Sequence, residues 1–136
     1  MAAAKHVALR WHHGMVFDGA AEGGPSIRLD GDGREGAGPM DTLLLALAGC
    51  TGSDVVSILE KMRFPVQAMT VEVAGERRPE HPKRYTSIVL TYRVRAPGAP
   101  EERVRHAIDL SLEKYCSVNH SLAPDIARSY ELVLES

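Results

Sequence analysis

The sequence predicts an α+β fold in which antiparallel β-strands pack against a long central helix. Three observations support this class. The segment from Pro39 to about Arg63 is suited to a helix and is strongly apolar in its first half. The segment Tyr85–Arg95 is rich in β-branched and aromatic residues, which favour strands. Three short strand candidates precede the helix, and the order βββαββααβ is typical of α+β domains with antiparallel pairing.

The N-terminal part of the chain is predicted to form three strands, at residues 5–12, 15–19 and 26–30. The first two make a hairpin around His13-Gly14. A glycine-rich loop at 31–38 then leads to Pro39, whose fixed φ suits the first turn of a helix. Pro65 ends that helix.

The second half is predicted to contain strands at 66–74, 85–95 and 128–135. A helix begins at Glu101, and the spacing of its apolar residues predicts one buried face, made of Val104, Ile108, Leu112 and Tyr115. A short helix or turn follows, with Ser117 as a candidate N-cap and Pro124 inside it.

Composition favours a single globular domain in the cytoplasm. The chain has 136 residues and a net charge of −2, without the basic block that would indicate nucleic-acid binding. The apolar run from Leu43 to Ala48 is too short to cross a membrane, and no signal peptide is visible. That run is apolar nearly all round, which predicts burial by a second helix or a second subunit.

Cys50 and Cys116 are the only cysteines. Cys50 lies well beyond the first turn of its helix, so the helix dipole cannot stabilise its thiolate. Burial and the nearby Asp54 oppose ionisation, so a reactive Cys50 needs a cation. The alternative is an inert core cysteine. The candidate cations are Arg10, Arg28, Arg34, Arg77 and Arg84.

Cys116 lies at the junction of two predicted helices, where it has more freedom to move than Cys50. This position suits a resolving thiol that attacks an oxidised Cys50, although packing under the helix end is an equal alternative. A third hypothesis is metal binding through both cysteines and His120, which follows Cys116 at helical spacing. No CxxC or HExxH pattern supports it, so we expect no metal and no bound cofactor.

Two segments resemble the OsmC/Ohr family of osmotically inducible and organic-hydroperoxide-resistance proteins, in its OsmC-like subgroup. One runs from Gly38 to Lys61 and contains Ala-Gly-Cys50-Thr-Gly-Ser-Asp-Val-Val-Ser-Ile-Leu. The other, Asp109–Val118, contains Glu-Lys-Tyr-Cys116-Ser-Val. The order of elements matches over essentially the whole chain.

The resemblance implies an intertwined homodimer whose antiparallel sheets wrap around two long central helices. Residues 1–37 would be swapped onto the partner, and 38–136 would form the helix-containing core. It also implies a thiol peroxidase for organic hydroperoxides, active in oxidative and osmotic stress defence. Cys50 would become a sulfenic acid, Cys116 would close the disulfide, and a dithiol or lipoyl-type reductant would reopen it.

The family also uses an arginine to hold the thiolate and a glutamate to orient the arginine. The resemblance makes Arg10 or Arg34 the candidate arginine. The glutamate usually follows the helix-opening proline directly, whereas this chain has Met40 there and Asp41 next. Asp41 is thus the candidate anchor. Because Met40 replaces a charged anchor with an apolar wall, the alternative function is non-catalytic binding of a small apolar or thiol-reactive ligand at the dimer interface.

Overall fold

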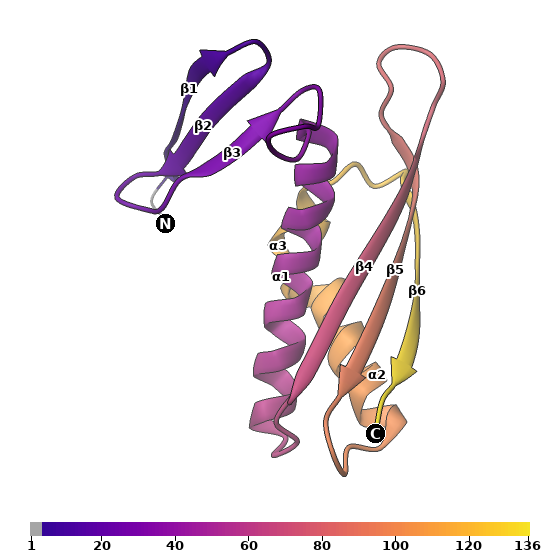
Figure 1. Cartoon of the computed structure of the whole chain (residues 1–136). Coiled ribbons are helices and arrows are strands. Elements are labelled where there is room, and N and C mark those ends of the chain that lie inside the picture. Colours follow the sequence, from indigo (N-terminus) through magenta and orange to yellow (C-terminus); the bar gives the residue numbers. More distant parts are fainter. Residues whose placement is uncertain (1–3) are drawn as a thin grey trace. The chain divides into compact units, whose positions relative to one another are not determined.

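The computed structural model describes residues 4–136 (Figure 1). The chain forms two compact units, Met1–Leu43 and Leu44–Ser136. Each contains a three-stranded sheet, with strand orders β1-β2-β3 and β4-β5-β6. The predicted α+β class is confirmed.

The first unit is built on an antiparallel sheet of β1 (Val7–His13), β2 (Val16–Ala21) and β3 (Ile27–Asp30). The three strands lie where the sequence predicts them, with ends shifted by up to two residues. Gly14 takes a φ of 51° in the hairpin turn, a conformation that costs glycine little. The Trp11 indole N–H donates to the Gly14 carbonyl at 2.8 Å and braces this turn.

One face of this sheet is apolar and exposed. Register places Leu9, Gly19 and Ile27 in one row across the strands. A neighbouring row holds Trp11 beside Phe17 and Leu29. The Val7 and Trp11 side chains are 81% and 62% exposed. An apolar face of this kind on a folded sheet indicates a surface that another chain segment covers.

A tight loop follows β3 and leads into the long helix. The buried Asp30 carboxylate accepts the backbone N–H groups of Asp32, Arg34 and Glu35 at 2.8, 3.2 and 3.0 Å. The hydrogen bonds from the backbone N–H groups of Glu35 and Asp32 are the main reason why the pKa of Asp30 lies below its usual value. The loop is therefore organised around one buried charge.

The long helix α1 (Pro39–Lys61) begins at Pro39, as predicted, and ends two residues before the expected Arg63. Arg63 adopts a left-handed φ of 69°, and the Phe64 N–H bonds back to the Leu59 carbonyl at 2.9 Å, which closes the helix end. Leu47, Thr51, Val55 and Leu59 are buried at every fourth position of the helix, and Gly52 beside Thr51 is buried too.

Helix α1 is long and apolar enough, by length and composition alone, to cross a membrane. The short run Leu43–Ala48 does not reveal this, because the apolar character continues along the whole helix. The buried stripe nevertheless packs on protein. A Cβ added at Gly52 would lie 3.4 Å from Met69 Cε and 3.6 Å from Val71 Cγ2, so the helix approaches the sheet closely there. In the second unit α1 is a core helix.

The second sheet contains β4 (Ala68–Arg77), β5 (Tyr85–Arg95) and β6 (Ala127–Leu134), with β5 in the middle. Strands β4 and β5 pair antiparallel, as predicted, but β5 and β6 pair parallel. The expectation of purely antiparallel pairing was wrong for this last strand. The helices between β5 and β6 carry the chain back along the sheet, so β6 enters it in the same direction as β5.

After β5 the chain forms α2 (Glu101–Leu110), a π-helical turn η1 (Ser111–Tyr115) and α3 (Ser117–Ser121). Helices α1 and α2 lie on the same side of the sheet (Figure 1). Pro124 lies beyond α3 rather than inside it. The prediction that Tyr115 shares the buried face of α2 was also wrong, because the wide turn rotates it outward, and its side chain is 51% exposed.

The β4-β5-β6 sheet has one buried and one exposed face. Two neighbouring residues of β5 therefore test its packing directly. Leu90 is fully buried, whereas its neighbour Val89 points to the opposite face and is 38% exposed. Leu90→Ala should lower the free energy of unfolding by about 2–5 kcal/mol because it leaves a cavity. Val89→Ala should change it by only about 0.5 kcal/mol. Chemical denaturation measures both, and equal losses would contradict the assignment of the two faces.

Candidate dithiol site

The second unit brings Cys50 and Cys116 together. Their side chains lie close enough that the Cys50 sulfur raises the pKa of the Cys116 thiol, although the two residues are distant in sequence. Both are free thiols; Cys50 on α1 is partly exposed and Cys116 is buried. Adjacent thiols of this kind can close a disulfide after a small movement.

The π-helical turn η1 explains how Cys116 reaches this position. The Cys116 N–H bonds to the Ser111 carbonyl five residues earlier, at 2.7 Å. The wider turn places both Ser111 and Cys116 in the interior. Cys116 then acts as the N-cap of α3, its sulfur accepting the Asn119 N–H at 3.4 Å. Cys116, rather than the predicted Ser117, is therefore the capping residue.

The two sulfurs differ in their surroundings. Burial raises the pKa of the Cys116 thiol to about 11, against the opposing effect of the Asn119 N–H. The neighbouring Cys50 sulfur and the Asp54 charge raise it further. Cys116 thus remains a protonated thiol at neutral pH, and it can donate its proton towards Cys50.

A chain of buried hydroxyl groups lies beside the thiols. The Tyr92 hydroxyl lies 2.8 Å from Thr51 Oγ1, which in turn lies 2.8 Å from Ser111 Oγ. Ser111 Oγ also lies 2.9 Å from Asp54 Oδ2. Tyr92, Thr51 and Ser111 are fully buried, and burial raises the pKa of Tyr92 to about 12, so the phenol keeps its proton.

The carboxylate sets the direction of this chain. An ionised carboxyl group only accepts hydrogen bonds, so Ser111 gives its single hydroxyl proton to Asp54. Thr51 then donates to Ser111, and Tyr92 donates to Thr51. Thr51 and Ser111 each donate one hydrogen bond and accept one, and the Tyr92 hydroxyl donates one, so every hydroxyl group buried between α1, β5 and η1 has a partner.

Sequence reasoning considered Asp54 only as a charge that disfavours a thiolate, and it missed Thr51, Ser111 and Tyr92. One signal was present in the sequence. Ser111 continues the apolar stripe of Val104 and Ile108 at helical spacing, and a polar residue in such a stripe needs a buried partner. The partner itself could not be identified, because α1 is distant in sequence.

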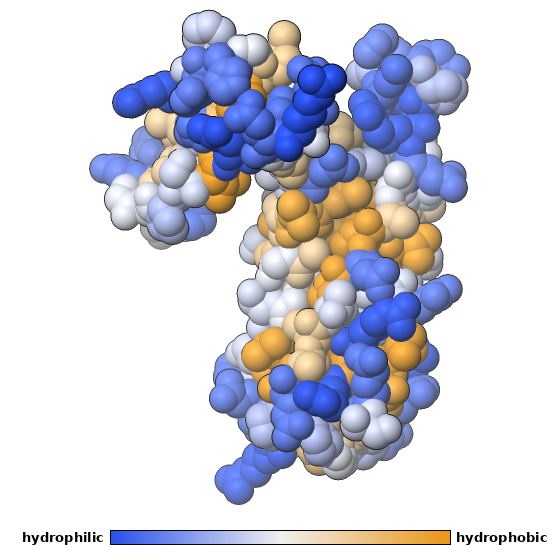
Figure 2. Space-filling view, viewed as in Figure 1, coloured by the Kyte–Doolittle hydropathy of each residue, from blue (hydrophilic) through white to orange (hydrophobic). Residues whose placement is uncertain are grey.

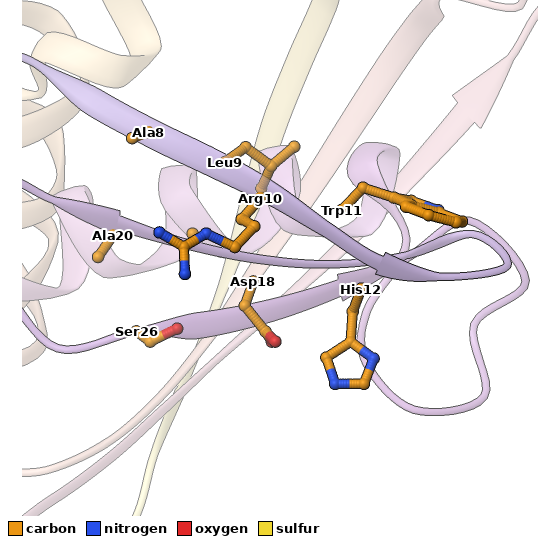
Figure 3. Close-up of a pocket in the computed structure, with 9 residues that line it drawn as sticks. Ala8, Leu9, Arg10, Trp11, His12, Asp18, Ala20 and Ser26 are labelled. Carbon is orange, nitrogen blue, oxygen red and sulfur yellow. The ribbon is translucent and has the colours of Figure 1, made fainter.

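The candidate arginines and the candidate anchor belong to the first unit. Arg10 lies on β1 and lines a shallow depression with His12, Asp18 and Ser26 (Figure 3). In the same close-up Leu9 and Trp11 lie on the other side of the strand. Arg10 therefore occupies the polar face of the N-terminal sheet.

The other arginines considered are placed differently. Arg28 is held by Asp18 at 2.8 and 2.9 Å and by Glu35 at 3.2 Å. The backbone of Arg34 is fixed in the Asp30 loop, and its side chain is exposed. Arg77 donates to the Lys83 carbonyl, and Arg84 pairs with Asp125 at 2.7 Å.

Asp41 lies in the first turn of α1 and is exposed. Its Oδ2 lies 3.6 Å from the position that a Cβ on Gly38 would take, so the side chain folds back towards the start of the helix. There the carboxylate complements the positive end of the helix dipole.

The metal hypothesis finds no support in the geometry. Among residues 4–136, no three His, Cys, Asp or Glu side chains converge in a way that could hold a metal ion. His120 is exposed on α3, and its backbone N–H bonds to the Cys116 carbonyl at 3.1 Å as part of that helix.

The fold and the paired thiols define an α+β protein with a dithiol built between a long core helix and a π-helical turn. The sequence profile of the OsmC family, described as "OsmC-like protein", matches residues 31–131. The chain belongs to this family, as its motifs predict.

Individual relatives agree with this assignment. The chain is 41% identical over 128 residues to Protein YhfA of Escherichia coli strain K12, covering 92% of this chain and 96% of YhfA. The OsmC-like protein from Mycoplasma pneumoniae superposes with a TM-score of 0.86 at 17% identity, over the full length of both chains. The organic hydroperoxide resistance protein OhrB of Bacillus subtilis gives 0.62 at 14% identity, covering 98% of each chain. At these identities the two structures show a shared fold.

The difference between the two thiols can be measured on Cys116 alone. In Cys50→Ser the effects of the Cys50 sulfur are lost but burial remains, so Cys116 should titrate above the ordinary thiol value of 9.0 and below about 11. Alkylation of the native variant at increasing pH, followed by mass spectrometry, gives the midpoint. Unfolding should return it to the ordinary value of about 9.0. A native midpoint below 9.0 would contradict the burial argument.

Proposed function

We propose that this protein is a thiol-dependent peroxidase that reduces organic hydroperoxides in oxidative and osmotic stress defence. The observation that carries the proposal is the adjacency of the Cys50 and Cys116 side chains. Two neighbouring free thiols are the minimum that a peroxide-reducing cycle ending in a disulfide requires.

The cycle uses the two sulfurs in different roles. The Cys50 thiolate attacks the outer oxygen of the hydroperoxide, the O–O bond breaks, and the leaving alkoxide takes a proton to become an alcohol. Cys50 is then a sulfenic acid. Cys116 attacks the Cys50 sulfur, forming the disulfide and releasing water. An external dithiol or lipoyl-type reductant restores both thiols, so the chemistry requires no bound cofactor.

The surroundings of the two thiols support this order of events. Cys50 is the more exposed of the two cysteines, as the thiol that meets the substrate must be. Cys116 is buried and held as a thiol, and it caps α3 at the junction of two helical elements. The more exposed Cys50 suits the peroxidatic role that the resemblance implies. The buried, protonated Cys116 suits the resolving role. The name of OhrB, with which this chain shares its fold, points to the same substrate class.

The proposal assigns thiolate stabilisation to Arg10 or Arg34, with Asp41 as the anchor. Arg10 is the stronger candidate because its side chain lines an open depression on the polar face of its sheet. The side chain of Arg28, in contrast, is already engaged by two carboxylates. Asp41 is a shorter anchor than the family glutamate and is displaced by one residue.

The proposal includes a homodimer in the cytoplasm, with residues 1–37 packed onto the partner. Its support is the exposed apolar face of the N-terminal sheet, where Leu9 and Ile27 are 55% and 58% exposed. Apolar side chains also remain on the surface of the second unit (Figure 2). Leu45 and Val56 of α1 are 62% and 37% exposed. A second copy of the chain would cover surfaces of this kind.

Turnover of an alkyl hydroperoxide with a dithiol reductant tests the proposal. Cys50→Ser should reduce consumption to the uncatalysed background, because the nucleophile is lost. Cys116→Ser should still form one sulfenic acid at Cys50, trapped by dimedone, but no internal disulfide. If the wild-type protein consumed hydroperoxide no faster than Cys50→Ser, the peroxidase function would be wrong.

A further inference from the structure

The disulfide-closing step needs a proton acceptor close to Cys116. Cys116 must lose its proton as it attacks the Cys50 sulfenic acid. It is fully buried, and its pKa is raised to about 11, so spontaneous ionisation at neutral pH is rare. The leaving hydroxide also needs a proton. A group inside the protein that accepts the first proton and returns it would solve both problems.

Asp54 is a carboxylate suited to that task. It follows Cys50 by one helical turn on α1, so the two side chains lie on the same face of the helix. Its charge acts on the Cys116 thiol. Asp54 is only partly buried, and it also lines an open pocket with Leu110 and Tyr115, so solvent reaches this residue.

Ser111 connects Asp54 to Cys116. Its hydroxyl group lies 2.9 Å from Asp54 Oδ2, and its carbonyl accepts the Cys116 N–H at 2.7 Å. Thr51 and Tyr92 fix the rotation of that hydroxyl through the buried chain. One residue therefore orients the carboxylate with its side chain and the resolving cysteine with its backbone, and its hydroxyl group engages only the Oδ2 oxygen of that carboxylate.

We propose that Asp54 takes the proton of the Cys116 thiol during disulfide closure and gives it to the hydroxide that leaves Cys50, while Ser111 acts as the positioning residue. The inference rests on the proposed function. The Cys116 sulfur forms the S–S bond, the S–O bond of the sulfenic acid breaks, and the departing hydroxide becomes water. Asp54 ends the step as a carboxylate, so the step consumes nothing beyond the two cysteines.

The two half-reactions should respond differently when the base is removed. Asp54→Asn keeps an oxygen that accepts from Ser111 but cannot take a proton. Closure should slow about 100-fold, the usual scale for loss of a general base. Sulfenic acid formation should be unchanged or somewhat faster, because a negative charge near the Cys50 thiolate is removed. A merely structural defect would slow both steps.

The experiment mixes the reduced full-length protein with an equimolar organic hydroperoxide and quenches it at successive times. Dimedone traps the sulfenic acid, and mass spectrometry counts the trapped and disulfide forms. Asp54→Asn should accumulate sulfenic acid, and Asp54→Glu, which restores a carboxylate, should recover most of the closure rate. Asp109→Asn is the matched control, since Asp109 accepts from Tyr130 at 2.9 Å instead of from the dithiol network.

The outcomes separate this inference from the function on which it rests. If wild-type protein forms neither sulfenic acid nor disulfide, the peroxidase function fails. If wild-type protein forms both and Asp54→Asn closes its disulfide at the same rate, the role of Asp54 is wrong and the function stands. If Asp54→Asn does not fold, Asp54→Glu decides the question. If disulfide closure and sulfenic acid formation were slowed by the same factor in Asp54→Glu, Asp54 would have a structural role only.

Discussion

The hydrogen bonds of the Ser111 hydroxyl hold the candidate site together. Ser111 stands at the first position of the π-helical turn, and its side chain contacts both Thr51 and Asp54 of α1. A buried hydroxyl group without partners would cost about 1–3 kcal/mol, so the turn is stable only when it is docked on α1 in this register. Because the carbonyl of the same residue holds the Cys116 N–H, docking of the turn also places Cys116 beside Cys50.

This arrangement gives the two cysteine thiols different surroundings. Cys50 stands on a rigid helix and is partly exposed, whereas Cys116 is enclosed at the junction of η1 and α3. Burial keeps the pKa of the second thiol high, and an ordinary substrate therefore meets only one nucleophile. Under the proposed function, the Cys116 sulfur attacks only after Cys50 has been oxidised. In this account the order of the two chemical steps follows from exposure.

The sequence predicts much of the fold, because most elements carry local signals. Pro39 and Pro65 bound the long helix, and the composition of Tyr85–Arg95 predicts its strand to the residue. The parallel pairing of β5 with β6 carries no local signal, since it depends on where the intervening helices return the chain. The π-helical turn was also missed, because one extra residue in a turn leaves the apolar spacing nearly unchanged. Of the site, the two sulfurs were predicted through the family motifs, while the hydroxyl chain needed contacts between residues about 40 to 60 positions apart.

The central claim is that Cys50 and Cys116 of one chain form a single redox site. Peptide mapping under non-reducing conditions, after treatment with an equimolar organic hydroperoxide, tests it most directly. The account predicts one cross-linked peptide joining Cys50 to Cys116 within the same chain, with loss of the two thiol hydrogens and reversal by a dithiol. Two free thiols after treatment, or a disulfide that joins different chains, would contradict it.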